Sequence, residues 1–363
     1  MHHPRSDVDR IYLPRKDGGR GLMSITTSYE VAMVGLECYL SNQEDSYLSQ
    51  VYKHEEGKKK YSIVKTSKSI IAKCNLEVPT FLDQQFEPSK KVKALKIKVK
   101  TTIKEMKKEK WESKPLHGQY PKTIDKPYVD QESTNCWLAK SDLKGETESL
   151  ITAAQDQALK TRNYQKYILG QDIDSTCRLC QKNEETIDHI LSGCEVLAKR
   201  EYLQRHNNVA SYIHWHVCKD NGIEVDEKWY QHQPTGIVKQ GSVTIFWDYP
   251  VTTDRTIPAN RPDIIIKNNE SNVCQLIDIS VPSDRNICLK YSEKKTKYKD
   301  LEIEVCRMWK KKTEVLPVIV GALGTIKKGS QEILDKISKN IEVSSIQKIT
   351  LLGSAHIIRK FGL

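Results

Sequence analysis

The stretches Arg261-Pro262-Asp263-Ile264-Ile265-Ile266 and Leu276-Ile277-Asp278-Ile279-Ser280-Val281 decide the fold of this chain, because each sets one aspartate in a short run of β-branched residues. Such runs predict buried strands, where a carboxylate is costly unless it binds a metal, hydrogen-bond donors or a cation. Fourteen residues separate the two acids, enough for a strand, a polar turn at residues 267–272 and a returning strand. We therefore predict a hairpin that brings Asp263 and Asp278 together.

Paired carboxylates are typical ligands of a divalent cation, and Mg²⁺ prefers such oxygens while it keeps water available for attack on phosphate. Asp278 and Ser280 share one face of the predicted strand, because side chains alternate along it. A lysine at position 280 would complete the nuclease motif PD-(D/E)xK. The serine found there means that the catalytic cation must come from elsewhere, and the helix that follows offers Lys294, Lys295 and Lys297.

That helix, predicted over residues 286–311, carries an apolar stripe at three- and four-residue spacing that should pack on the sheet. The stripe consists of Ile287, Tyr291, Tyr298, Leu301, Val305 and Met308. Lys294 and Lys295 flank it and can share a face with Tyr298, whereas Lys297 points further away. In the structural alternative, the first acid caps a turn after the proline, the second pairs with an interior cation, and the lysines solvate a helix.

The remaining elements around this pair predict a mixed α/β layer, because a strand, a crossover helix and a further strand require parallel neighbours. Further strands are predicted at residues 243–247 and 315–320, and closing helices at 331–341 and 346–361. Upstream, helices are predicted over residues 29–52 with Ser28 as cap, 150–164 with Thr147 or Ser149 as cap, and 196–212. Residues 111–130 and 221–240 are interpreted as connectors.

A metal-binding pattern, Cys177-x2-Cys180-x8-His189-x4-Cys194, precedes the acidic pair. Three thiolates and an imidazole fill the tetrahedral shell of Zn²⁺ and leave no position for an activated water, so the predicted zinc is structural. The alternative is three buried cysteines and an unrelated histidine. Cys218 is a weaker substitute ligand. The histidines that follow are interpreted as ordinary residues that could also contact phosphate or base: His206, His214 and His216.

Composition favours a polyanionic partner. The 363 residues include 58 Lys and Arg against 47 Asp and Glu, a formal charge of +11. Residues 90–110 carry ten lysines and two glutamates, which predicts a basic helix that either contacts nucleic acid or is merely solvated. Neither a membrane span nor a signal peptide is evident, so we expect an intracellular, nuclear protein whose ten cysteines are mostly metal ligands or buried thiols.

The order of these motifs resembles the C-terminal region of reverse transcriptase proteins encoded by site-specific non-LTR retrotransposons. The motifs are the Cys-Cys-His-Cys knuckle, Arg261-Pro262-Asp263, Asp278 and Lys295-x-x-Tyr298. The opening Leu13-Pro14-Arg15-x3-Gly19-Arg20-Gly21-Leu22 resembles the sequence just after the polymerase of that family. The resemblance thus covers most of the chain, as a post-polymerase linker, a zinc knuckle and a restriction-like endonuclease.

The resemblance implies that Asp263, Asp278 and Lys295 are the catalytic acids and lysine, with Tyr298 in the accompanying motif and Lys294 as second choice. The family's endonuclease nicks target DNA, and the released 3′ hydroxyl primes reverse transcription of the element RNA. This chain departs from the family in lacking a Tyr-x-Asp-Asp signature and room for a polymerase upstream. A fragment of a longer reading frame, a decayed copy and a host-used gene stay open as its origin.

We therefore expect an α+β or α/β chain: a basic helical linker (residues 1–130), a helical region with the zinc knuckle (131–235), and a PD-(D/E)xK-like restriction-endonuclease fold with a mixed sheet flanked by helices (236–363). The expected function is Mg²⁺-dependent DNA nicking with a structural Zn²⁺, and the partners are target DNA and element RNA. Expected nucleic-acid contacts are Arg261, Lys96, Lys100 and Lys104. A binding module without catalysis and an unfolded product of a dead element are the alternatives.

Overall fold

The computed structural model describes residues 2–76, 87–140 and 142–363, and the chain forms two compact units. One unit comprises Met1–Ser6 and Pro115–Leu363, and the other Asp7–Lys114. The expected domain boundaries after residues 130 and 235 both fall inside the first of these units, and they stay predictions.

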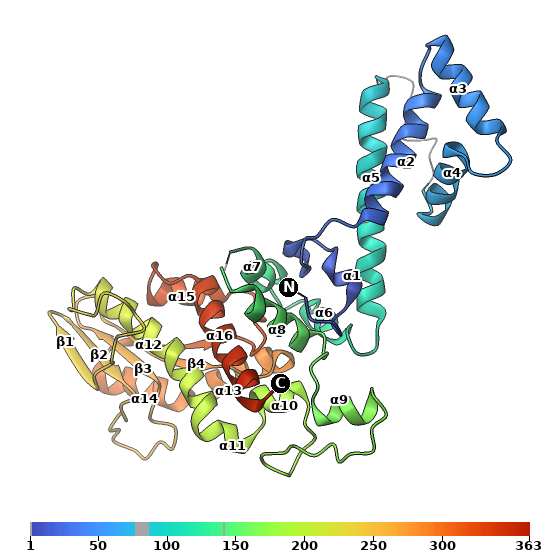
Figure 1. Cartoon of the computed structure of the whole chain (residues 1–363). Helices are drawn as coiled ribbons and strands as arrows, with labels where there is room; N and C mark the ends of the chain where they lie inside the picture. The colour runs from blue at the N-terminus through green and yellow to red at the C-terminus, as the bar shows by residue number, and fades with distance from the viewer. Residues whose placement is uncertain (1, 77–86, 141) are drawn as a thin grey trace. The chain divides into compact units, whose positions relative to one another are not determined.

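The larger unit is built on a five-stranded mixed sheet with strand order β1-β2-β3-β4-β5 (Figure 1). Its strands are β1 (Ile237–Gln240), β2 (Val243–Trp247), β3 (Ile264–Asn268), β4 (Val273–Ser280) and β5 (Lys312–Ile319). The first four pair antiparallel, and β5 runs parallel to β4. The predicted α+β fold with a mixed sheet and a β3–β4 hairpin is confirmed. β1, however, lies in the segment expected to be a polar connector.

Helices cover both faces of this sheet, because the central strands alternate two sets of apolar side chains. On one face, Ile264 and Ile277 pack with α12 (Leu203–Asp220), α15 (Ser330–Ile337) and α16 (Val343–Phe361). On the other, Ile265 and Leu276 pack with Tyr298 and with α14 (Lys299–Trp309), and α13 (Ile287–Lys297) contacts β5. A side chain's position along β3 or β4 therefore decides which helices it meets.

One long helix was expected over residues 286–311, and the structure instead has α13 and α14, which meet at Tyr298. Tyr298 has a non-helical backbone (φ −100°, ψ 8°) and a ring that is only 1% exposed. The break between the two helices lets the large Tyr298 side chain enter the core against the sheet, while α13 and α14 both follow the surface of the sheet.

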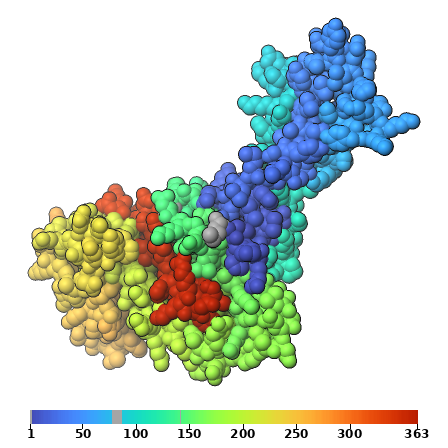
Figure 2. Space-filling view, viewed as in Figure 1, coloured from blue at the N-terminus to red at the C-terminus, as the bar shows by residue number. Residues whose placement is uncertain are grey.

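The rest of the larger unit packs a Cys/His segment against the C-terminal helix. Its helices are α6 (Gln119–Ile124), α7 (Gln131–Lys140), α8 (Gly145–Gln155), α9 (Arg162–Tyr167), α10 (Ile187–Ser192) and α11 (Glu195–Leu197), followed by a π-helical turn (Ala198–Tyr202) that leads into α12. Cys177 and Cys194 share a core cluster with Ile357 and Ile358 of α16. The outer side of α16, drawn in red, is exposed on the face seen in Figure 2.

The expected helix over residues 150–164 is wrong in its extent. α8 ends at Gln155, Gln157 follows in the left-handed region (φ 54°), and a new helix, α9, begins at Arg162 with Thr161 as its cap. The expected caps of that helix, Thr147 and Ser149, lie within α8 and are buried. The connector predicted at residues 111–130 likewise contains α6.

The core of the unit Asp7–Lys114 is built from helices. It contains α1 (Val8–Ile11), a short 3₁₀ turn (Arg15–Asp17), α2 (Ile25–Ser41), α3 (Ser46–Gly57), α4 (Ile63–Lys73) and α5 (Pro88–Ser113). The predicted basic helix is confirmed as α5, whose Leu95, Val99 and Ile103 join the core. The helix expected over residues 29–52 is two helices, capped by Ser24 and Asp45 rather than by Ser28. No helix in the described ranges is long and apolar enough to span a membrane.

Candidate active site and metal centres

Asp263 and Asp278 lie next to each other at one end of the β3–β4 hairpin. The register pairs Ile264 with Ile277, so the next position outward sets Asp263 beside Asp278. The main-chain amide of Ile279 donates a hydrogen bond to Asp263 Oδ2 at 2.6 Å. Because Asp278 has the same parity as Leu276, its side chain faces α13 and α14. The hairpin thus presents Asp278 to the helix that carries the candidate lysines and sets Asp263 beside it.

Asp278 is the more deeply buried of the two acids. Its side chain is only 3% exposed, and its Oδ2 lies 2.6 Å from Lys294 Nζ. Burial raises the pKa of Asp278 and the neighbouring charge of Asp263 raises it further, while Lys294 acts in the opposite direction. This carboxylate therefore needs a cation, and Lys294 supplies one where the strand itself has Ser280.

The other expected side chains on this helix have different partners. Lys295 Nζ donates to the backbone carbonyl of Val315 in β5 at 2.5 Å. The Tyr298 hydroxyl donates to the Arg261 carbonyl at 3.0 Å and lies within hydrogen-bonding reach of Asp278. Lys297, expected to point away, donates to that hydroxyl at 2.9 Å. The structure thus brings Asp263, Asp278, Lys294 and Tyr298 together. The Lys295 ammonium contacts the backbone of β5 instead.

A histidine from α12 joins the acidic pair. His206 Nε2 lies 3.1 Å from Asp263 Oδ2. Burial alone would lower the pKa of His206, but its hydrogen bond to Asp263 and the attraction of that charge prevail and raise the pKa to about 9. The imidazole is therefore a cation at neutral pH. Sequence reasoning treated His206 as an ordinary residue, and no local pattern links it to an acid 57 positions away.

Arg261 lies at the rim of the site. Its guanidinium donates to the carbonyl of Asp248 at 2.9 Å and to Asp248 Oδ2 at 2.8 Å. Asp248 follows β2 in the left-handed region (φ 46°), and its amide donates to the Asp263 carbonyl. The side chain of Arg261 is 57% exposed, so its charge reaches solvent beside the carboxylates.

The donor set suits a hard divalent cation. Two carboxylates on one face of a hairpin repel each other, and Mg²⁺ binds to such oxygens. Lys294 and His206 each neutralise one of them in the protein alone. Chemically, the arrangement offers oxygen ligands for a metal together with two nearby cations that can face an anionic substrate.

The Cys177, Cys180, His189 and Cys194 cluster is assembled as predicted. Each residue can offer one ligand atom, and these atoms all lie within 4.8 Å of one another. Cys180 Sγ and His189 Nε2 are 3.3 Å apart. Cys177 and Cys194 are fully buried, while the helix α10 that carries His189 is capped by Thr186. The four residues can therefore hold one metal ion.

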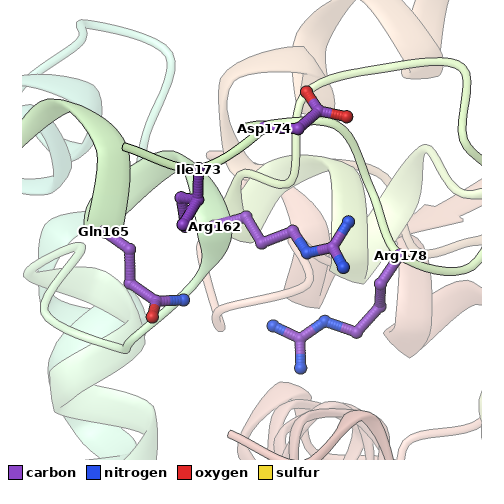
Figure 3. Close-up of a pocket in the computed structure, with 5 residues that line it drawn as sticks. All are labelled: Arg162, Gln165, Ile173, Asp174 and Arg178. Atoms are coloured by element: carbon purple, nitrogen blue, oxygen red, sulfur yellow. The ribbon is translucent and has the colours of Figure 1, made fainter. Parts of the chain in front are cut away.

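A hollow of about 530 Å³ adjoins this cluster, lined by Arg162, Gln165, Ile173, Asp174 and Arg178. Figure 3 shows the guanidinium groups of Arg162 and Arg178 extending into it. Arg178 is held by Glu185, with its N–H groups 2.9 and 2.6 Å from the carboxylate oxygens. Two anchored guanidinium groups are a suitable binding surface for phosphate. Sequence reasoning missed both arginines, because neither belongs to a motif.

The expected lysine contacts Lys96, Lys100 and Lys104 lie in the unit Asp7–Lys114. All three line a cavity of about 820 Å³ between α2 and α5, which Lys107 also borders. Lys104 Nζ lies 2.7 Å from Asp17 Oδ2, so part of this positive charge is neutralised within the unit. A role of these lysines in binding nucleic acid stays a prediction.

In comparisons with known proteins, no family model matches the chain, and no curated protein is significantly similar to it. What the protein does must therefore be argued from the geometry of these sites.

Proposed function

We propose that this protein is a metal-dependent DNA endonuclease of the PD-(D/E)xK restriction-like type, derived from a non-LTR retrotransposon. The observation that carries the proposal is the group of Asp263 and Asp278 on one face of a hairpin with Lys294 Nζ 2.6 Å from Asp278. Lys294 comes from the following helix and stands in for the motif lysine that Ser280 replaces. The mixed sheet with helices on both faces is consistent with such a fold.

In this proposal, Asp263 and Asp278 would hold Mg²⁺, which when bound polarises a phosphoryl oxygen and favours ionisation of water. Lys294 faces the same carboxylate and would orient the attacking water and stabilise the charge that develops on the phosphate. Tyr298 would keep Asp278 oriented through its hydroxyl. His206 holds Asp263 from the opposite side and, as a cation, lowers the local negative charge that a phosphodiester would meet.

Electrostatics support a nucleic-acid substrate. The chain carries a formal charge of +11, and arginines line the hollow beside the Cys/His cluster. We propose that this cluster holds a structural Zn²⁺ through Cys177, Cys180, His189 and Cys194, because a complete Cys₃His set leaves no open position. The knuckle would then position target DNA or element RNA through backbone phosphates. With genomic DNA as its substrate, the protein would act in the nucleus.

A plasmid-nicking assay tests the endonuclease proposal. The wild-type chain should convert supercoiled DNA to the open-circular form with Mg²⁺ or Mn²⁺, and Asp263→Asn and Asp278→Asn should each lower the rate by about 100-fold or more, because a metal ligand is lost. Asp254→Asn is the matched control, since Asp254 is an exposed acid whose partner is Arg307. Equal nicking by wild type and Asp278→Asn would remove the site assignment.

A second function, binding without cleavage, has an observation of its own in favour. Lys294 and His206 each contact one of the two acids, so each carboxylate has a cationic partner without any metal. A chain that retains DNA on a filter but never nicks it, with either cation, supports this reading. Metal-dependent cleavage that is lost in Asp278→Asn excludes it.

A further inference from the structure

A second cluster of metal-ligand side chains lies apart from the knuckle and from the acidic pair. It consists of His214 and Cys218 on α12 and His232 in the segment between α12 and β1. One ligand atom from each residue lies within 4.8 Å of the others. His214 Nδ1 is 2.8 Å from His232 Nε2 and 3.5 Å from Cys218 Sγ. Three soft or borderline donors therefore converge on one point.

The spacing on α12 explains how two of these donors meet. His214 and Cys218 are four residues apart and thus share one face of the helix. In a tetrahedral zinc site with bonds of about 2.0–2.3 Å, neighbouring ligand atoms are separated by about 3.3–3.6 Å. The observed separations of 2.8 and 3.5 Å are close to these values, so a small movement of the His232 ring would complete the geometry.

The surroundings of the cluster are apolar. His214 is 0% exposed and Cys218 1% exposed, within a core that includes Ile213, Val217 and Ile245. The Trp247 ring packs edge-on against His214 at 5.4 Å between ring centroids. Burying an imidazole and a thiol costs free energy unless they have strong partners, and the partly buried His232 offers His214 only one short contact, at 2.8 Å.

The cluster also has a structural task that a metal would perform. Residues 221–236 contain neither helix nor strand, yet they lead into β1 at the edge of the sheet. A hydrogen bond from Trp215 Nε1 to the Asp226 carbonyl at 2.8 Å and the packing of Trp229 on Tyr212 attach them to α12. A bond from His232 to a shared ion would fix this segment to α12, much as a covalent crosslink does.

We propose that His214, Cys218 and His232 form a second Zn²⁺ site, distinct from the knuckle, that fastens the segment before β1 to α12. Two imidazoles and one thiolate are a donor set that zinc accepts, and three protein ligands leave one position for water or an anion. This zinc proposal is independent of the proposed endonuclease activity. Among the described residues, no contact given above joins His214, Cys218 or His232 to Asp263 or Asp278.

Zinc content tests this site. The 363-residue wild-type chain, purified under reducing conditions, should contain two zinc ions, and Cys218→Ser and His232→Ala should each contain one fewer. His216→Gln is the matched control, because His216 lies on the same helix but outside the cluster. The knuckle variant Cys180→Ser should also lose one ion. Unchanged zinc in both Cys218→Ser and His232→Ala would overturn the proposal.

A cobalt titration keeps the test decisive if the first two variants fold poorly. Cys180→Ser leaves the second cluster intact, so Co²⁺ should still produce the visible absorption of a tetrahedral site with one thiolate ligand. Circular dichroism of the same samples establishes that the chain is folded. A folded Cys180→Ser chain that shows no such absorption would refute the second site while leaving the endonuclease proposal untouched.

Discussion

Lys294 and Lys295 are adjacent in the chain, yet their ammonium groups have different partners. Lys294 Nζ contacts Asp278, whereas Lys295 Nζ donates to the Val315 carbonyl in the neighbouring strand. Family resemblance names Lys295 as the catalytic lysine, and the geometry favours Lys294. The difference between the two side chains can be measured directly.

If the proposed endonuclease is correct, Lys294→Met should lower metal-dependent nicking by about 100-fold, because it removes the cation that would face the reacting phosphate. Lys295→Met should lower it by less than about tenfold, since it removes only a hydrogen bond to the backbone. Initial rates of plasmid nicking at saturating Mg²⁺ give both values, and melting temperatures control for folding. The opposite ranking would restore Lys295 as the catalytic residue.

The two aspartates and the candidate pair Lys294 and Lys295 were predictable from sequence, but which of the two lysines meets Asp278, and the part of His206, were not. An acid within a β-branched run is visible by itself, and the turn at residues 267–272 sets the register that aligns Asp263 with Asp278. Which lysine meets Asp278 depends on the break between α13 and α14 at Tyr298. The apolar stripe continues across that position, so the sequence pattern does not indicate the break. His206 reaches Asp263 only through packing of α12 on the sheet, which leaves no local sequence signal.

At the scale of elements, buried polar side chains fasten helices to one another. Arg205 of α12 is 2% exposed and donates to the Leu191 carbonyl at 2.8 Å and to Ser354 Oγ of α16 at 3.0 Å. Its aliphatic stem crosses α16 at Gly353, where an added Cβ would lie 2.6 Å from Arg205 Cγ. The close approach of these two helices therefore requires a glycine at position 353.

This contact predicts a coupled pair of substitutions. Gly353→Ala should lower the free energy of unfolding by about 1–3 kcal/mol, because the new methyl group overlaps the Arg205 stem. In an Arg205→Ala background, the same change should cost much less, since the obstacle is gone. Urea denaturation of the four proteins completes the cycle. Additive effects would mean that the helices adjust freely at this crossing.

A buried carboxylate in the 3₁₀ turn before α13 (Asp284–Asn286) predicts a pH dependence of stability. Asp284 accepts hydrogen bonds from the amides of Leu323 at 2.9 Å and Thr325 at 3.1 Å, and burial raises its pKa to about 6. The folded chain then binds more protons than the unfolded chain between the ordinary aspartate pKa and about 6. Stability from this group is therefore highest below that window and falls as the pH rises through it.

Between about pH 5 and about pH 7, we expect Asp284 to lower the free energy of unfolding by about 1 kcal/mol. Asp284→Asn removes the titrating group, so the difference in stability between wild type and variant should shift by that amount over the same range. Urea midpoints of both proteins at each pH measure it. A difference that does not change with pH would show that Asp284 ionises normally in the folded chain.

At the scale of the whole molecule, the sequence predicts single motifs and strands better than it predicts the contacts between distant elements. The ligand spacing of the Cys/His cluster is local and was evident, as was the alternation of the central strands. That Cys177 and Cys194 share a core with Ile357 and Ile358 was not evident, because this contact joins distant parts of the chain. For the same reason β1 was missed: its exposed edge position leaves little apolar pattern to detect.

If the Cys/His cluster holds the proposed zinc, the shared core predicts that removing the metal loosens helices beyond the knuckle. A chelator should raise amide hydrogen exchange in α10 and, through the common cluster, in α8 and α16, because metal binding and folding are coupled. Exchange in α2 and α5 of the other unit should stay unchanged, since their core contains none of these ligands. Hydrogen-exchange mass spectrometry of the full chain, with and without chelator, compares all of these helices in one sample. Cys180→Ser should reproduce the pattern in α8, α10 and α16 without any chelator. Protection of α16 that survives both treatments would mean that the C-terminal helix keeps its packing without the metal.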